Sequence, residues 1–110
     1  MRARWWSEEA GAQAAVEWIS SLGLPQGGCR IVDGSGLSRL NLVSPRLLAG
    51  LLEQMARRPD FDVFKNSLPI AGKDGTLRNR LRSTAAEGNL RAKTGYIGYV
   101  SSLSGYLHTR

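Results

Sequence analysis

The residue types that could do chemistry in this 110-residue chain are few. Cys29 is the only cysteine, which excludes an internal disulfide framework and a cysteine-rich metal site. His108 is the only histidine and lies two residues from the last position. This argues against a Ser/His/Asp or Cys/His catalytic group and against a histidine-based metal site. Any chemistry must therefore use lysine, serine, threonine, tyrosine, carboxylates or the backbone.

The segment with the most chemical content is Arg91-Ala92-Lys93-Thr94-Gly95. Its K-T-G tripeptide is one of three motifs, with S-x-x-K and S-D-N (or S-x-N), that occur together in enzymes with an active-site serine. As a bare tripeptide, it fits equally well an exposed strand whose lysine keeps a sheet edge soluble. The surrounding residues must decide between these interpretations.

Two helices with clear end signals would help to position this segment. One is predicted over residues 8–22, because Ser7 can cap its start and Gly23 suits its end. Its apolar face would consist of Ala15, Trp18, Ile19 and Leu22. The other is predicted over residues 45–57, where Ser44 is the N-cap and a proline occupies the first helical position.

The remaining elements are short. A strand is predicted over residues 29–32, followed by the turn-rich run Asp33-Gly34-Ser35-Gly36. Residues 61–66 should add a helical turn, and Asp74 could cap a short helix over residues 76–82.

Residues 90–108 have the pattern of a β-hairpin turning at Gly98-Tyr99. Glycine at the first central position predicts a type II′ turn. The element order gives an α/β (α+β) class, with helices packed against an antiparallel sheet. A sheet of two or three strands has an unprotected edge, so we expect an architecture that is incomplete at both ends and prone to aggregate.

The formal net charge is +6, and residues 61–110 carry eight basic and three acidic side chains. This surplus is typical of a solvated arginine-rich surface. It is also compatible with an alternative function, in which a small basic non-catalytic domain binds anions or nucleic acid. Nucleic-acid binding of that kind would weaken steeply with salt.

The sequence lacks membrane and export signals. No stretch approaches the ~18–20 apolar residues of a membrane span. Arg2 and Arg4 lead through Trp5-Trp6-Ser7 into two glutamates, without the apolar region of a signal peptide. A fragment of a longer exported protein would have the same features, so they do not determine the location.

Four segments occur in a characteristic order: residues 33–41 (DGSGLSRLN), 68–77 (LPIAGKDGTL), 93–95 (KTG) and 101–106 (SSLSGY). The series resembles the C-terminal part of the D-alanyl-D-alanine carboxypeptidases of the low-molecular-mass class C penicillin-binding proteins, the peptidase S13 (DacB-like) family. The resemblance covers about residues 11–109. It implies that residues 1–110 form the C-terminal part of one catalytic domain with a partial β-lactamase/transpeptidase-like fold.

The resemblance implies a serine acyl-transfer enzyme that acts on peptidoglycan stem peptides. Such enzymes remove the terminal D-Ala, and some also cut cross-links as endopeptidases. β-Lactams acylate the same serine, and neither a metal nor an organic cofactor is needed. The full-length family member would be periplasmic or otherwise extracytoplasmic, with no specific nucleic-acid partner.

The resemblance assigns roles only in the third motif. Lys93 would place its ammonium beside the serine of the second motif, S-x-N, assist proton transfer and attract the substrate's terminal carboxylate. Thr94 would offer its hydroxyl to that carboxylate, and Gly95 would make room for the substrate backbone along the strand edge. Tyr96 would give its backbone N–H to the oxyanion hole, although the family often has threonine or serine there.

The other two motifs are absent. No serine of the chain is followed by lysine three positions on, or by asparagine two positions on. We therefore expect a C-terminal fragment that is inactive alone and that could be complemented by a separately encoded N-terminal part. The segment at residues 33–41 is interpreted as scaffold, in which Asp33 or Ser38 satisfies backbone N–H groups.

Overall fold

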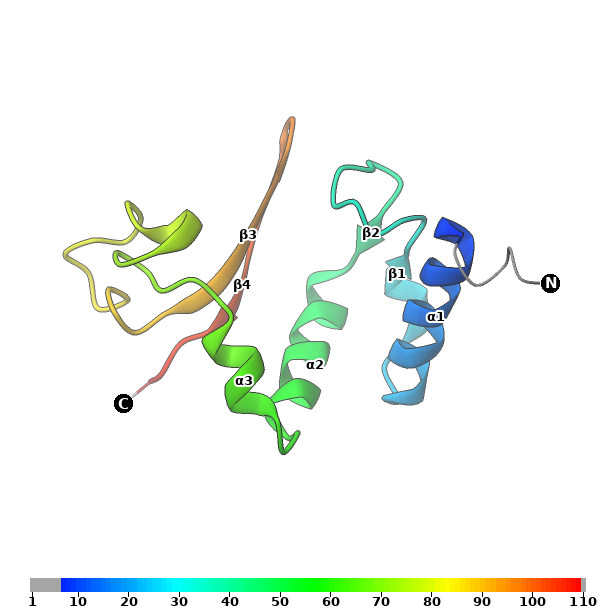
Figure 1. Cartoon of the computed structure of the whole chain (residues 1–110), viewed down its shortest axis with the longest axis horizontal. Helices are drawn as coiled ribbons and strands as arrows, with labels where there is room; N and C mark the ends of the chain where they lie inside the picture. The colour runs from blue at the N-terminus through cyan, green and yellow to red at the C-terminus, as the bar shows by residue number, and fades with distance from the viewer. Residues whose placement is uncertain (1–6, 110) are drawn as a thin grey trace. The chain divides into compact units, whose positions relative to one another are not determined.

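The computed structural model describes residues 7–109, and the chain forms two compact units, residues 1–54 and 55–110 (Figure 1). The elements are α1 (Glu8–Ser21), η2 (Gln26–Gly28), β1 (Cys29–Arg30), β2 (Leu42–Val43), α2 (Pro45–Ala56), α3 (Phe61–Asn66), η3 (Gly75–Leu77), β3 (Arg91–Ile97) and β4 (Val100–Tyr106). Both sheets are antiparallel pairs. This mixture of helices and antiparallel strands confirms the predicted class.

Helix α1 begins where its sequence predicts and ends at Ser21, one residue before the predicted end. The Ser7 hydroxyl accepts a hydrogen bond from the Ala10 N–H at 3.1 Å, and Gly23 has a φ of +73°. The predicted apolar face is partly wrong, because Trp18 is 42% exposed whereas Ala12 and Ile19 are buried. Ala12 and Ile19 lie two turns apart on one face, and Trp18 lies about 100° around the helix from Ile19.

The strand predicted over residues 29–32 is only two residues long. Strand β1 pairs with β2, so that Cys29 lies opposite Val43. The ladder stops because the Val32 N–H donates to the Asn41 side-chain oxygen at 2.7 Å instead of to a neighbouring strand. Strand β2 was not predicted, since two residues show no periodicity.

Helix α2 follows the predicted start closely. The Ser44 hydroxyl accepts from the Leu47 N–H at 3.1 Å, which is the expected cap. The helix ends at Ala56, one residue before the predicted end. Leu47 is the one buried residue of this helix in the described structure.

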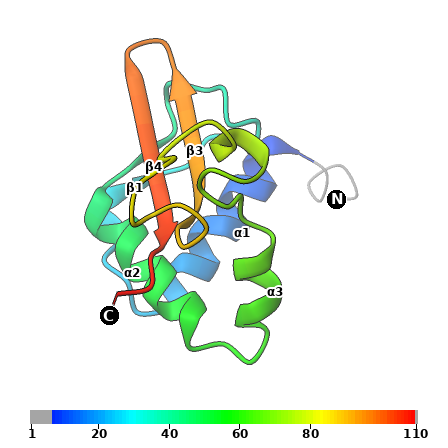
Figure 2. The ribbon, with the colours of Figure 1, turned by 90° about the vertical axis from the view of Figure 1, so that its left-hand side faces the viewer.

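In the second unit, aromatic rings join helix α3 to strand β4. The rings of Phe61 and Phe64 meet the ring of Tyr106 edge-on, with centroids 4.9 and 6.3 Å away. Such edge-to-face pairs are favourable because a ring edge is positive and a ring face is negative. Burial raises the pKa of the Tyr106 hydroxyl. Figure 2 shows α3 at the base of the unit and the hairpin turn at its far end.

The hairpin is confirmed, but its turn differs from the prediction. Residues 91–97 pair with residues 100–106, from Arg91 opposite Tyr106 to Ile97 opposite Val100. A type II′ turn needs a positive φ at Gly98. The positive φ, +67°, is found at Tyr99 instead, so the type II′ prediction is wrong.

The helix predicted over residues 76–82 is also wrong. Only the single 3-10 turn η3 forms there. Leu81 and Ser83 have φ values of 60° and 59°, which a right-handed helix cannot contain. Asp74 makes no side-chain cap, because its carboxylate accepts the Ile70 N–H at 2.6 Å.

Candidate active site

The start of strand β3 has neighbours on both edges. Strand β4 pairs along one edge, and residues 69–71 lie along the other. On that second edge the Ala92 N–H donates to the Pro69 carbonyl at 3.0 Å, and the Ala71 N–H donates to the Leu90 carbonyl at 2.9 Å. Ala71 and Ala92 are fully buried. The beginning of β3 is therefore firmly held.

Beyond Ala92 the second edge of β3 is open within the described part of the second unit. Because successive backbone N–H groups on a strand point to opposite edges, those of Thr94 and Tyr96 point the same way as that of Ala92. Among the described residues of the second unit, no group accepts a hydrogen bond from either N–H. The uncovered edge thus coincides with residues 94–96 of the K-T-G-Y segment.

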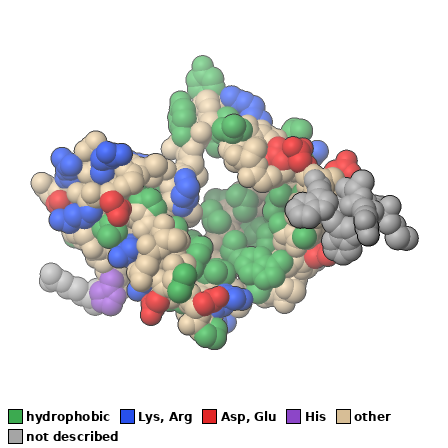
Figure 3. All heavy atoms as spheres, in the orientation of Figure 1, with side chains coloured by type: hydrophobic (Ala, Val, Ile, Leu, Met, Phe, Trp, Pro, Cys, Tyr) green, Lys and Arg blue, Asp and Glu red, His purple; other side chains and the backbone are tan. Residues whose placement is uncertain are grey.

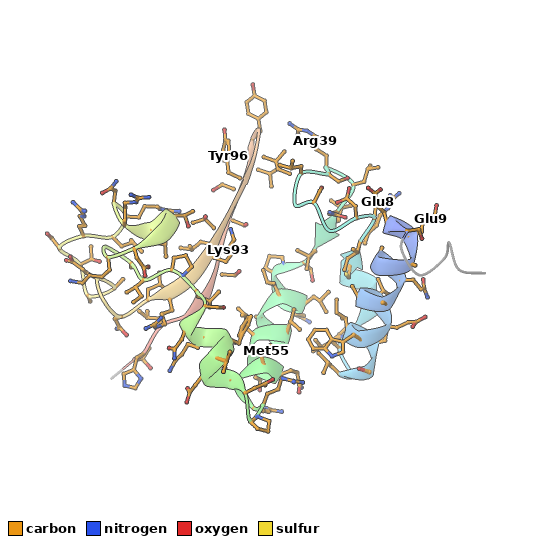
Figure 4. All side chains as sticks on the ribbon, viewed as in Figure 1. Glu8, Glu9, Arg39, Met55, Lys93 and Tyr96 are labelled. Carbon is orange, nitrogen blue, oxygen red and sulfur yellow. The ribbon has the colours of Figure 1, made fainter. Side chains whose placement is uncertain are left out.

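Lys93 lies at this open edge. Its side chain is exposed, and its ammonium group donates to the Thr94 carbonyl at 2.7 Å. Figure 4 shows Lys93 part-way along the hairpin and Tyr96 nearer the turn. The ammonium therefore adds positive charge to the same edge as the N–H groups of Thr94 and Tyr96.

Thr94 is tied to a residue that the sequence analysis missed. Its hydroxyl donates to the Thr76 hydroxyl at 3.0 Å, and Thr76 belongs to the 3-10 turn η3. The sequence pattern of Asp74-Gly75-Thr76 predicts only a turn and a helix cap. Nothing local to Thr76 marks it as a partner of a strand residue 18 positions later.

Gly95 leaves room between the two strands of the hairpin. A Cβ atom there would meet the side-chain hydroxyl of Ser102, which lies opposite it in the register, is exposed and would have to turn away. Tyr96, the next residue, is 77% exposed. The side chain of Tyr96 is thus free of the described core, and only its backbone contributes to the open edge.

Basic side chains gather in the segment that follows η3, where Figure 3 shows Lys and Arg groups on the face drawn. Arg78, Arg80 and Arg82 are all exposed. A cluster of one sign raises the local concentration of oppositely charged ligands.

The arrangement can bind an anionic, extended ligand. It offers two unpaired backbone N–H donors, an ammonium group and a threonine hydroxyl along one strand edge. Over residues 7–109 no group of three or more His, Cys, Asp or Glu side chains is placed to hold a metal ion. In the same part of the chain, no helix combines the length and the apolar character that crossing a bilayer would require.

Comparison with known proteins identifies the family. Residues 2–110 match the D-Ala-D-Ala carboxypeptidase 3 (S13) family. The chain belongs to this family. The family match confirms the resemblance seen in the motif order.

Individual relatives agree with the assignment. The D-alanyl-D-alanine carboxypeptidase of Actinomadura sp. (strain R39) is 45% identical over 104 residues, which is 90% of this chain and 19% of that protein. The carboxypeptidase DacB of Haemophilus influenzae is 37% identical over 103 residues, covering 92% of this chain and 22% of the relative. The chain thus spans about a fifth of the length of these relatives.

Solved structures of the same family share the fold. Penicillin binding protein 4 (dacB) of H. influenzae in complex with a β-lactam matches with a TM-score of 0.83 at 37% identity, over 92% of this chain and 24% of that protein. A second structure of the H. influenzae protein matches with a TM-score of 0.81. These matches confirm the partial penicillin-binding-protein fold, while the roles of residues 93–96 stay predictions.

Proposed function

We propose that this chain is part of a serine-type D-Ala-D-Ala carboxypeptidase, to which it supplies the K-T-G strand. The substrates would be peptidoglycan stem peptides, with endopeptidase cleavage of cross-links as a further reaction, and β-lactams would acylate the same serine. The observation that carries this proposal is the open edge of β3 at Thr94 and Tyr96, in a chain of this family. The name of the S13 family supports the substrate class, and the β-lactam complex of the H. influenzae protein supports the inhibitor class.

Each group at the edge has a chemical task in this proposal. The Lys93 ammonium assists proton transfer to and from a serine that lies outside this chain. The Tyr96 N–H stabilises the oxyanion that develops on the attacked carbonyl, because a fixed donor needs no reorganisation during the reaction. The Thr94 hydroxyl binds the terminal carboxylate of the substrate. No step requires a metal or an organic cofactor.

The isolated chain should have no peptidase activity. Neither S-x-x-K nor S-x-N occurs in its 110 residues, so the nucleophile and its lysine are absent. Nucleophile and base act as a unit, and the remaining motif cannot replace them. A separately encoded N-terminal part could supply them, and the working location would be extracytoplasmic.

The proposal is tested with a chimera in which this chain replaces the matching segment of the H. influenzae relative. We expect the chimera to bind labelled penicillin covalently and the isolated chain not to. Lys93→Ala should lower turnover of a D-Ala-D-Ala peptide by about 10³-fold, the scale of general acid–base assistance. Lys73→Ala is the matched control, since Lys73 is an exposed lysine of the same unit that lies outside β3.

Two results would contradict the proposal. A stoichiometric penicillin adduct on the isolated chain would disprove its inactivity. Full turnover by the Lys93→Ala chimera would disprove the role of that lysine.

A further inference from the structure

The hydroxyl group of Thr94 has one hydrogen-bond partner in the described structure, the hydroxyl group of Thr76 at 3.0 Å. Thr76 is exposed and makes no other side-chain hydrogen bond among the described residues. We propose that Thr76 is a positioning residue, which holds the Thr94 hydroxyl in the orientation that binds the substrate's carboxylate. The role of Thr94 towards substrate rests on the proposed function, whereas its orientation by Thr76 does not.

Thr76 is suited to this task because its own backbone is held from several sides. The Asp74 carboxylate accepts the Ile70 N–H at 2.6 Å, which closes the turn on its N-terminal side. On the other side, Leu77 is fully buried, and its carbonyl accepts the Gly72 N–H at 2.9 Å. The hydroxyl of Thr76 therefore projects from a fixed support.

The same segment also fixes the position of Thr94. Residues 69–71 pair with the start of β3 through the Ala92 N–H and the Leu90 carbonyl. Residues 70–77 then turn back on themselves, through the bond between Gly72 and Leu77. One continuous segment thus sets the register of β3 and places Thr76 beside Thr94. The contact between the two threonines follows from the paired backbone and is not a chance meeting of two surface side chains.

The hydroxyl pair can form a short hydrogen-bond chain. A hydroxyl donates one hydrogen bond and accepts up to two. When Thr94 turns its proton to a carboxylate, Thr76 can turn its own proton to the Thr94 oxygen, and consecutive bonds of this kind polarise one another. Valine at position 76 would keep the shape but remove this bond, whereas serine would keep the hydroxyl.

The orientation itself is measured on the chain alone. Three-bond couplings of isotope-labelled protein report how far the Thr94 side chain is confined to one rotamer. We expect one dominant rotamer in the wild type and in Thr76→Ser, and averaging over rotamers in Thr76→Val. Thr84→Val is the matched control, since the Thr84 hydroxyl bonds only within its own loop, to the Leu81 carbonyl and the Ala86 N–H. Averaging in the wild type, or an unchanged rotamer in Thr76→Val, would overturn the proposal.

The consequence for recognition is measured in the chimera. Thr76→Val should raise KM for a peptide with a free terminal carboxylate about tenfold, with little change in kcat, because a bond present in both ground and transition states is weakened. The C-terminal amide of the same peptide should show no such change, and Thr76→Ser should restore KM. An equal loss on acid and amide would instead indicate a structural role and overturn the proposal.

The rotamer measurement and the kinetic measurement test the positioning role of Thr76 and the proposed function separately. If the wild-type chimera has no turnover, the proposed function fails, and the rotamer measurement still decides whether Thr76 orients Thr94. If turnover is normal but the rotamer is unaffected by Thr76→Val, the proposed function stands and the positioning role fails.

Discussion

Two motif-bearing segments of this chain use their hydrogen bonds in opposite ways. In residues 33–41 the polar groups bond to one another: the Asp33 carboxylate accepts from the Ser35 N–H at 3.0 Å and the Ser35 hydroxyl at 2.8 Å. The Asn41 side chain completes the loop by accepting the Val32 N–H and donating to the Asp33 carbonyl. In residues 93–96, by contrast, two backbone N–H groups have no acceptor within the described second unit.

This difference distinguishes a loop that supports the structure from a strand edge that can bind a ligand. A loop whose polar groups are mutually satisfied has little left to offer a ligand, and its glycines and serines serve its own geometry. A strand that is held at its start and open further along presents donors without having to rearrange. The predicted scaffold role of residues 33–41 agrees with the bonds that Asp33 and Ser38 accept from backbone N–H groups.

The two units can be followed separately by spectroscopy. All three tryptophans lie in residues 1–54, and all three tyrosines lie in residues 55–110. Tryptophan fluorescence therefore reports on the unit with the closed loop, and the NMR signals of the tyrosine rings report on the unit with the hairpin.

The largest expected effect comes from Gly105→Ala in the hairpin. A Cβ atom at Gly105 would meet the Arg91 carbonyl oxygen and the Cα and Cβ atoms of Ala92, which belong to the paired strand and cannot move aside. We expect a loss of about 3 kcal/mol, the upper part of the usual range for overpacking. Urea unfolding followed by the tyrosine signal measures it.

The loop provides the control for that substitution. A Cβ atom at Gly34 would meet no other atom within 4 Å, and the φ of Gly34 is not positive. Gly34→Ala should therefore change stability by less than about 0.5 kcal/mol. Similar losses of stability for Gly105→Ala and Gly34→Ala would contradict the difference described between the hairpin and the loop.

A smaller effect on stability is expected when the Asp33 carboxylate is protonated. The Ser35 hydroxyl, and then the Ser35 N–H, hold the pKa of the Asp33 carboxyl below its ordinary value of 3.8. The stabilisation is therefore fully present above that ordinary value, and is lost as pH falls through the lower pKa of the folded state. In melting followed by tryptophan fluorescence, the wild type should have a higher Tm than Asp33→Asn, and this difference in Tm should disappear only below about pH 4. A difference that instead disappears near neutral pH would show that another group controls the loop.

The smallest effect is expected at the hairpin turn. Tyr99 is fully exposed and has a φ of +67°, a conformation that asparagine tolerates better than most residues. Tyr99→Asn should stabilise the hairpin by about 0.5 kcal/mol. Tyr99→Ala removes the ring but keeps the Cβ atom, so it should bring no such gain; an equal gain would mean that the ring and not the backbone is responsible.

Some predictions failed because a local sequence pattern was overridden by a hydrogen bond or a backbone conformation elsewhere in the chain. Asp74 has the sequence of a helix cap, yet its carboxylate is used by the Ile70 N–H, and the chain turns out of helical geometry at Leu81. Val32 continues an apolar run, yet its N–H is taken by the Asn41 side chain nine positions later. Gly98 satisfies the rule for a type II′ turn, but the positive φ falls on the next residue.

The residues alone determined the two long helices, the hairpin and the K-T-G segment. Caps such as Ser7 and Ser44 act within three residues of their partners. The alternation of apolar and polar residues that is typical of a strand can be recognised within about eight positions. Only the tertiary structure decided that residues 69–71 cover β3 as far as Ala92 and leave Thr94 and Tyr96 open. The physical reason is that contacts between distant segments depend on how the intervening chain folds, which no local pattern encodes.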